Sequence, residues 1–383
     1  MAGKKEKERK RMKKTLIVKL SETTYKKLVK KKEEVFPQGA DWEEFFNYLV
    51  RDIHLEELGG ERISKSTKEH LFELWVRNFA DNLPYIREGK TIADLVPPEP
   101  EKAPKSAGIV VGAGPSIWKY KHLETLAESD FDGKVILCDR MTIPALKAGI
   151  TPEKFDIYIV GVDGAPIIAK WYDDPIVDKY GSDLKVCIIT STHPDVRKRL
   201  EKANAQIYWF NPIFDDWRQN ESFTKLQLIM TKSEKLPKGV PSMSALGHAG
   251  GCAWVMAHSL LRCSPICLLG LNLGWDADTP LEKTQYFSTF LAQTGGNVEL
   301  ARTAFKKIYN PYWKCEAIVD PVFNHYREAF LEAVKMTEPW VITVNCTGGG
   351  CLFGDGIYCM NFEDFLKYYK DVEELKKHFL KAD

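Results

Sequence analysis

A short glycine-rich segment has the clearest potential for chemistry in this sequence. Gly112, Ala113, Gly114, Pro115 and Ser116 follow the apolar run GIVV and precede a helical pattern. Glycines at such a point let the backbone approach a phosphate. Proline and serine suit the first turn of a helix, whose N-terminus attracts anions. The segment lacks the third glycine of the dinucleotide fingerprint, so its spacing predicts a nucleotide-binding loop of only moderate specificity.

Two carboxylates end the next two apolar runs. Asp139 lies twenty-five residues after Gly114, roughly where an acidic side chain can reach a ribose hydroxyl. A helix cap or an ion pair is an equal alternative for this residue. Asp163 can hold a metal ion or a ribose, and the competing interpretation is a turn before Gly164.

Histidines and a second glycine-rich segment supply further polar groups. His193 follows another apolar run and can serve as a proton donor or a phosphate contact, although most loop histidines do neither. The segment PSMSALGHAGG precedes a helical pattern, so its glycines and polar side chains predict a second anion-binding helix N-terminus. From this segment we assign to the site Ser244, Gly247, His248 and Gly250, with Ser242 and Gly251 beside them.

The later strand exits are less specific. Asn272 follows the run PICLLGL and joins the nucleotide-binding candidates, and Asp276 and Asp278 can bind magnesium or simply form a hydrated loop. We assign no resident metal site. Three glycines at 348–350 indicate close backbone approach, either to a ligand or to another loop. The aromatic residues at 209, 210, 217, 286 and 287 could line an acceptor pocket, but aromatic residues more often belong to a core, so we leave them out of the site.

Apolar runs that alternate with helical segments must position these residues. The runs cover residues 108–114, 134–140, 156–164, 185–191, 205–212, 265–275 and 340–346, and helical patterns cover 118–129, 143–149 and 194–204. Near-continuous apolar strands with helical crossovers predict a parallel sheet covered on both faces, an α/β Rossmann-like domain over residues 105–370. Ligands of such sheets bind at the carboxyl ends of the strands, where the residues above lie.

The first 35 residues differ in charge from the rest of the chain. Residues 1–35 carry fourteen Lys and Arg against five Asp and Glu, a net charge of +9, so the other 348 residues sum to −8 (1 − 9). We expect a basic, disordered leader over 1–13 and a strand–helix–helix segment over 14–56 that resembles a ribbon-helix-helix module. Such a module makes a homodimer more plausible than DNA binding. A helical connector with a proline-rich linker over 57–104 and a helical tail over 371–383 complete the predicted organisation.

Composition excludes several classes of protein. The chain has 383 residues, 44% of them hydrophobic, with no apolar run long enough to span a bilayer and no apolar segment behind its charged N-terminus. Its nine cysteines include no C-x-x-C pair, so structural thiols are expected rather than disulfides or zinc ligands. These features predict a cytoplasmic protein without a membrane span.

Three segments carry a family resemblance. GIVVGAGPSIWKYKHLETL, PALKAGITPEKFDIYIVGVDG and GHAGGCAWVMAHSLLRCSPICLLGLNLGW resemble the 6-hydroxymethylpterin diphosphokinase MptE-like family, over about residues 107–365. That family includes motility accessory factors implicated in flagellin glycosylation, and VNCTGGGCLFGDGI is similar to a signature of that branch. The G-x-G-P-S loop also resembles that of bacterial sialyltransferases, which bind CMP-sialic acid there. The resemblance places Gly112, Gly114, Pro115 and Ser116 on the nucleotide-binding loop and Asp163 at an acidic strand end.

The resemblance leaves the reaction open. Family members either move a diphosphate from ATP or use CMP-activated nonulosonic acids. The HAHGDN-type and FTDGDR-type stretches of the pterin enzymes are STHPDV and HAGGCA here, and a family aspartate is Asn272, which weakens the diphosphokinase interpretation.

The leading hypothesis is therefore a transferase of a CMP-activated sugar. In it His193 or His248 protonates the leaving phosphate, and a carboxylate such as Asp163 activates the acceptor. One alternative is an ATP- and Mg²⁺-dependent diphosphokinase acting on a pterin-like alcohol, with Asp139 and Asp163 on the metal. The other is a DNA-associated regulator that senses a nucleotide.

Overall fold

The computed structural model describes residues 21–35, 42, 71–100, 105–216, 218 and 222–382. The chain forms two compact units, Met1–Leu58 and Gly59–Asp383. In the first, α1 (Glu22–Val35) begins at Ser21, whose Oγ accepts a hydrogen bond of 3.2 Å from the Thr24 N–H. This helix was predicted. The leader over 1–13, the predicted strand through Leu20 and, apart from Trp42, the second predicted helix lie outside the described residues.

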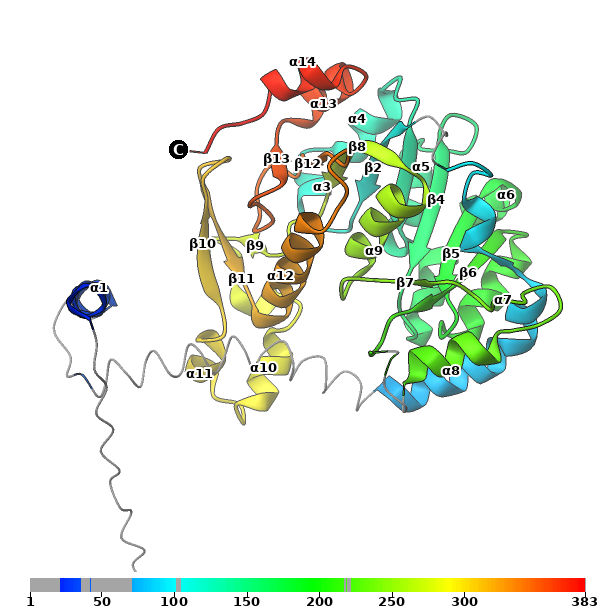
Figure 1. The fold of residues 1–383 in the computed structure, drawn as a ribbon, viewed down its shortest axis with the longest axis horizontal. Coiled ribbons are helices and arrows are strands. Elements are labelled where there is room, and N and C mark those ends of the chain that lie inside the picture. The colour runs from blue at the N-terminus through cyan, green and yellow to red at the C-terminus, as the bar shows by residue number, and fades with distance from the viewer. Residues whose placement is uncertain are drawn as a thin grey trace, which may run out of the picture. The chain divides into compact units, whose positions relative to one another are not determined.

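A parallel sheet forms the centre of the larger unit (Figure 1). Its order is β1-β6-β5-β4-β3-β2-β8-β12-β13, with β7 paired to β6, and every pairing is parallel. The seven predicted strands are all present, as β2 (Ser106–Val111), β3 (Lys134–Cys138), β4 (Asp156–Gly161), β5 (Lys185–Ile189), β6 (Gln206–Pro212), β8 (Cys263–Leu269) and β12 (Thr343–Asn345). Three short strands were not predicted, β1 (Lys90–Thr91), β7 (Ser242–Met243) and β13 (Ile357–Cys359).

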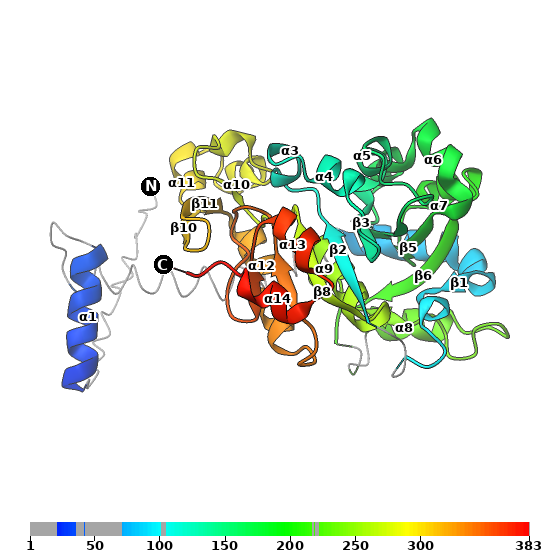
Figure 2. The ribbon, with the colours of Figure 1, turned by 90° about the horizontal axis from the view of Figure 1, so that it is seen from above.

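The sheet is buried on both faces, which explains its apolar strands. Alternate residues of a strand point to opposite faces, and Ile109 and Val111 belong to one hydrophobic cluster while Val110 belongs to another. Figure 2 shows α5, α6 and α7 near the β3–β6 end of the sheet and α12, α13 and α14 at the other end. The crossover helices are α3 (Ser116–Lys119), α4 (His122–Glu128), α5 (Thr142–Lys147), α6 (Pro175–Tyr180), α7 (Pro194–Lys202), α8 (Phe223–Met230) and α9 (Ala249–Val255). The predicted Rossmann-like arrangement is confirmed.

Strand order reverses between β2 and β8. From β2 the chain moves outward through β3, β4, β5 and β6, then returns to β8 on the other side of β2 and continues to β12 and β13. The loops after β2 and β8 therefore begin side by side, at the carboxyl ends of two adjacent parallel strands. In open parallel sheets, ligands bind at such a reversal, beyond the carboxyl ends of the strands.

A second, antiparallel sheet was not predicted. It has the order β10-β11-β9 and lies within the segment between β8 and β12. This segment contains β9 (Trp275–Asp276), α10 (Phe287–Gln293), α11 (Val298–Arg302), β10 (Lys306–Asn310), β11 (Cys315–Val319) and α12 (Pro321–Lys335). It thus follows directly after the loop at the strand reversal.

The predicted connector is part of the larger unit. Residues 71–88 are helical, and Trp75 and Phe79 are buried against the sheet domain. The Asn78 amide donates to the carbonyls of Gly164 (2.9 Å) and Ser191 (3.0 Å), and the following β1 pairs with β6. The compact unit therefore begins before the predicted boundary at 104/105, because this helix buries its apolar face on the sheet.

The C-terminal helices and the cysteines agree with the sequence. The tail forms α13 (Phe362–Tyr368) and α14 (Val372–Lys377), with Phe365 and Leu375 fully buried. All nine cysteines are free, and all but Cys315 are buried, as expected for structural thiols. Among the described residues, the structure contains no helix with the length and apolar character that crossing a membrane requires.

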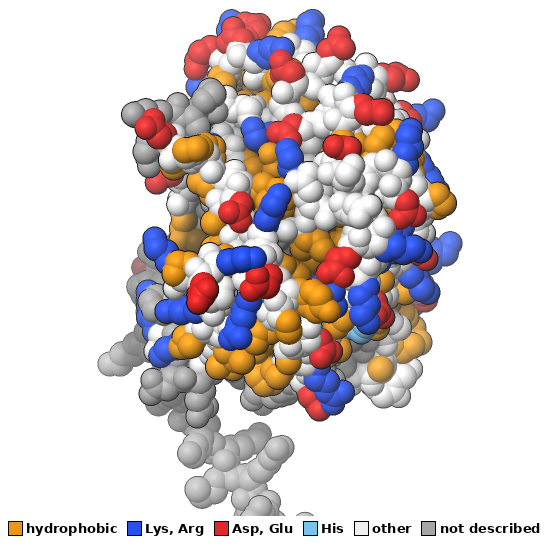
Figure 3. All heavy atoms as spheres, turned by 90° about the vertical axis from the view of Figure 1, so that its right-hand side faces the viewer, with side chains coloured by type: hydrophobic (Ala, Val, Ile, Leu, Met, Phe, Trp, Pro, Cys, Tyr) orange, Lys and Arg blue, Asp and Glu red, His pale blue; other side chains and the backbone are white. Residues whose placement is uncertain are grey.

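Exposed apolar side chains lie on the face of the larger unit that includes α8. Figure 3 shows hydrophobic side chains among lysines and arginines on the side that includes α7 and α8. On α8 the exposed residues are Leu226, Leu228, Ile229 and Met230.

Candidate functional site

The loops after β2 and β8 touch each other through their backbones. Gly114 N–H donates to Gly270 O over 2.8 Å, and Gly112 N–H donates to Leu269 O over 2.8 Å. A Cβ on Gly114 would lie 2.3 Å from Asn272 Oδ1 and 2.5 Å from Gly270 O. These glycines are therefore required for the close approach of the two loops, whatever the loops bind.

Ser116 and Asn272 connect the loops through their side chains. The Ser116 hydroxyl is buried and donates to Asn272 Oδ1 over 2.8 Å, and Ser116 N–H contacts the same oxygen at 3.4 Å. The bond orients the amide with its oxygen toward Ser116, which leaves the Asn272 Nδ2 donor for a ligand. Ser116 therefore holds the Asn272 side chain in a fixed orientation. Ala113 is half-buried beside them, and Pro115 precedes α3, which has only four residues.

The three C-terminal glycines pack on the same loop. A Cβ on Gly350 would lie 2.6 Å from Asn272 O, and Cys351 N–H donates to that oxygen over 2.7 Å. A Cβ on Gly348 would lie 2.6 Å from the Tyr120 ring. The close approach indicated by the sequence is therefore to another loop.

Asp139 is a buried carboxyl group at the end of β3. It is 3% exposed, and its Oδ1 accepts a hydrogen bond of 2.8 Å from the Arg140 N–H. Burial, with the negative charge of Asp163, raises the pKa of Asp139 to about 7. A Cβ on Gly161 would lie 3.3 Å from Asp139 Oδ2 and 3.5 Å from the Tyr172 hydroxyl, which is buried without a partner. Asp139 can therefore take up or release a proton near neutral pH.

Asp163 follows β4 and affects the pKa values of two tyrosines. Its Oδ1 accepts from the Ala165 N–H over 2.8 Å, so it also forms the turn that the sequence allowed. Burial is the main cause that raises the pKa values of Tyr286 and Tyr326. The negative charges of Asp320 and Asp163 raise both pKa values further. The negative charge of Asp163 therefore acts on Asp139 and on both tyrosines.

Asp320 is a further buried carboxyl group, at the start of α12. It is 1% exposed, and its Oδ1 accepts from the Val322 and Phe323 N–H groups, each over 2.9 Å, at the start of α12. Its Oδ2 is buried without a hydrogen-bond partner. Burial raises the pKa of Asp320 to about 6, so the group is mostly ionised at neutral pH.

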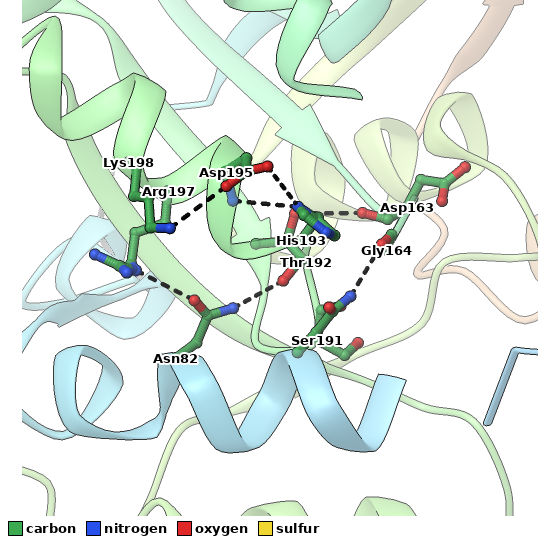
Figure 4. A network of polar contacts seen from close by, with 10 residues as sticks. Asn82, Asp163, Gly164, Ser191, Thr192, His193, Asp195, Arg197 and Lys198 are labelled. Carbon is green, nitrogen blue, oxygen red and sulfur yellow. Dashed lines mark hydrogen bonds and ion pairs between the residues drawn. The ribbon is translucent and has the colours of Figure 1, made fainter. Parts of the chain in front are cut away.

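His193 lies between the carboxyl end of β5 and the start of α7 (Figure 4). It is the N-cap of α7, and its Nδ1 accepts from the Asp195 N–H over 3.2 Å. Figure 4 also shows the Asp163 carboxylate pointing away from the His193 ring. The Asn82 amide buttresses the loop by donating to Thr192 O over 2.8 Å. His193 and Asp163 therefore do not form a catalytic pair in this arrangement.

His248 is the N-cap of α9. Its Nδ1 accepts from the Gly251 N–H over 3.2 Å, its Nε2 is buried without a partner, and its ring lies 5.3 Å from that of Tyr326. A Cβ on Gly247 would lie 2.6 Å from the Tyr326 ring, and Gly250 is buried at the helix start. Burial lowers the pKa of His248 to about 4. Its neutral Nε2–H can donate a hydrogen bond, but it is not a cationic acid at pH 7.

We predict that His248 remains neutral at pH 5.5. The unfolded chain takes up this proton near pH 6.5, so the residue's contribution to stability is complete above pH 6.5 and is lost as the pH falls toward 4. Nitrogen-15 NMR of histidine-labelled protein measures this state. The His248→Asn variant identifies the signal and retains a good N-cap. An imidazolium signal for His248 at pH 6 would contradict the prediction.

The remaining candidates have local partners. Asp276 forms an ion pair of 2.8 Å with Lys119, which occupies one carboxylate of the considered magnesium pair. Ser244 Oγ accepts from the Leu246 N–H over 3.4 Å. No group of three or more His, Cys, Asp or Glu side chains in the described parts of the chain is arranged to hold a metal ion.

Sequence reasoning missed Tyr172, Asp320 and Tyr326, and it considered Tyr286 but left it out of the site. The signal for Asp320 was present, because Asp followed by Pro is a typical start of a helix. The aromatic residues carried no comparable signal, since most aromatic residues with this spacing belong to a core.

Comparison with known proteins gives the family. No curated protein matches the sequence. Among solved structures, the chain is similar to the MAf glycosyltransferase from Magnetospirillum magneticum AMB-1, with 12% identity and a TM-score of 0.45. The similarity covers 73% of this chain and 38% of that one, so the chain spans well under half of its length. The family model described as 6-hydroxymethylpterin diphosphokinase MptE-like matches residues 77–278, more than half of the sequence, and the chain belongs to this MptE-like family.

Proposed function

We propose that this protein is a nucleotide-dependent transferase, and that it transfers a sugar from a CMP-activated donor to a hydroxyl group. The observation that carries the proposal is the strand reversal between β2 and β8. There two glycine-rich loops are locked together and present Asn272, with Asp139 and Asp163 at the next two strand ends.

The donor chemistry follows from these groups. The N–H groups of Gly112, Gly114 and Ser116 already donate within the two loops, so the Asn272 amide is the neutral donor that we assign to a single phosphate. In this proposal the Asp139 carboxyl group accepts a hydrogen bond from a ribose. A CMP-sugar contains one phosphodiester, and its sugar leaves as the phosphate takes the electron pair of the broken bond. Asn272 adds no charge to the site, and Asp139 is about half protonated near pH 7. This set supports a donor that does not depend on a resident metal.

A magnesium-dependent diphosphokinase is the second candidate. The description of the matching family model favours it, and Asp139 and Asp163 could share one magnesium ion with the phosphates of ATP. Such a complex requires an ionised Asp139, so its formation would strengthen as the pH rises through 7.

Thermal unfolding with CMP, CDP, CMP-sialic acid, ATP and UDP, each with and without Mg²⁺, separates the candidates. A ligand at about 100 times its Kd stabilises a protein by about 2.7 kcal/mol, which is a readily measured rise in Tm. We expect CMP and CMP-sialic acid to raise the Tm without Mg²⁺. A rise only with ATP and Mg²⁺ would support the diphosphokinase, and no rise with any nucleotide would contradict both.

A further inference from the structure

A cluster of four aromatic rings includes Phe323 in the first turn of α12, the helix that the buried Asp320 caps, and none of the four belongs to the residues assigned to the nucleotide site. Phe323 lies at its centre, with ring centroids 6.0 Å from Trp275, 5.6 Å from Tyr286 and 6.2 Å from Tyr326. All four rings are only half-buried. They come from β9, the segment before α10, and α12, so the cluster belongs to the insertion rather than to the central sheet.

Three buried polar atoms on this cluster have no partner. They are Asp320 Oδ2, Trp275 Nε1 and His248 Nε2. Buried polar groups are nearly always hydrogen-bonded in folded proteins, and an orphaned one costs about 1–3 kcal/mol unless a ligand satisfies it. One anionic acceptor and two N–H donors are therefore without a partner next to half-buried aromatic rings.

This chemistry suits a carbohydrate. A sugar ring offers an apolar face for an aromatic ring and hydroxyl groups that both donate and accept hydrogen bonds. We propose that the cluster binds a carbohydrate, that this sugar is the acceptor of the transfer, and that Asp320 accepts the proton of its attacking hydroxyl. The role of this sugar as the acceptor rests on the proposed function. The binding of a sugar at the cluster does not depend on it.

The reaction balances with the groups at hand. The acceptor hydroxyl oxygen forms a bond to the anomeric carbon of the donor sugar. The bond from that carbon to the phosphate oxygen breaks, and its electron pair leaves with CMP. Asp320 Oδ2 takes the hydroxyl proton and later releases it to water. Trp275 of the cluster lies three residues after Asn272 on the segment that follows β8, so the cluster is close in the chain to the proposed donor loop.

Asp320→Asn is a clean test of this carboxylate. Asparagine keeps an oxygen for the Val322 and Phe323 N–H groups and is an equally good N-cap, so the fold is retained while the charge is lost. Asp371→Asn is the matched control, because Asp371 caps α14 through the same kind of bonds to Glu373 and Glu374 and is exposed.

The first readout is binding of p-nitrophenyl β-D-galactopyranoside, measured by saturation-transfer NMR without nucleotide. We expect binding to the wild type and to Asp371→Asn, and weakening by about tenfold or more in Asp320→Asn and Phe323→Ala, from the loss of a charged hydrogen bond or of a stacking face. Equal binding to all four proteins, no binding at all, or binding only of a linear serine peptide would overturn the sugar site.

The second readout is turnover of CMP-sialic acid, with CMP-induced stabilisation measured in parallel. We expect Asp320→Asn to turn over the donor about a hundredfold more slowly while the Tm rise with CMP is unchanged. Turnover at the wild-type rate would overturn the role of Asp320 as base. If the wild type neither binds CMP nor turns over the donor, the proposed function fails, and the galactoside result still decides the sugar site.

Discussion

Replacing Gly114 with alanine is expected to lower the free energy of unfolding by about 3 kcal/mol and to abolish nucleotide-induced stabilisation. The new Cβ would lie 2.3 Å from Asn272 Oδ1 and 2.5 Å from Gly270 O, far inside contact distance. Because one of these atoms is backbone, the two loops must move apart, and the Ser116–Asn272 hydrogen bond breaks with them. Urea unfolding and thermal unfolding with CMP measure the two effects.

Gly295→Ala is the control for a glycine substitution as such. Gly295 has a positive φ of +64° but no atom within 4 Å of the new Cβ, so we expect a cost of about 1 kcal/mol from backbone strain alone. A Gly114→Ala protein as stable as Gly295→Ala, with its CMP response intact, would show that the loops are not locked together as described.

Replacing Asp139 with asparagine is expected to raise stability above neutral pH. In the folded state the pKa of Asp139 is about 7, against an ordinary value of 3.8, so between these values the folded protein holds a proton that the unfolded chain has lost. Stability therefore falls as the pH rises from about 4 to 7, by about 4 kcal/mol for a shift of about three units, and is constant above that range. Asparagine removes this dependence and can still accept from the Arg140 N–H.

The check is urea unfolding of the wild type and Asp139→Asn at pH 5 and pH 8. We expect the stability advantage of the variant to grow from about 1.5 kcal/mol at pH 5 to about 4 kcal/mol at pH 8, with Asp371→Asn following the wild type at both. A variant that is less stable than the wild type at pH 8 would mean that Asp139 is stabilised there as an anion. A carboxyl group kept at the cost of stability is typical of a functional site.

The sequence predicted the central sheet well because both of its faces are buried. Strands such as 135–138 are apolar at every position, which is a signal that no loop gives. It did not predict β9, β10 and β11, since strands such as KKIYN have exposed lysines and their partners are set by tertiary pairing. Residues 71–88 were recognised as helical, but their place on the sheet depends on contacts of Asn78 and Trp75 that no local pattern reveals.

The residues of the candidate site were also predicted only in part. Asp139, Asp163 and Asn272 could be selected from the sequence because each follows a predicted strand. The carboxyl ends of parallel strands lie at one edge of the sheet. The purpose of Gly114 and Ser116 could not be inferred, since it depends on how close the β8 loop approaches. Spacing also cannot show burial, which makes His248 a neutral donor rather than an acid and gives Asp139 a pKa near 7.

Hydrogen–deuterium exchange of the full chain with and without CMP tests the central claim most directly, because it locates the nucleotide. We expect new protection in residues 112–119, 139–142 and 270–276, the two loops of the strand reversal and the end of β3. Protection confined to other segments, or an unchanged exchange pattern at saturating CMP, would contradict the assignment of this edge as the nucleotide site.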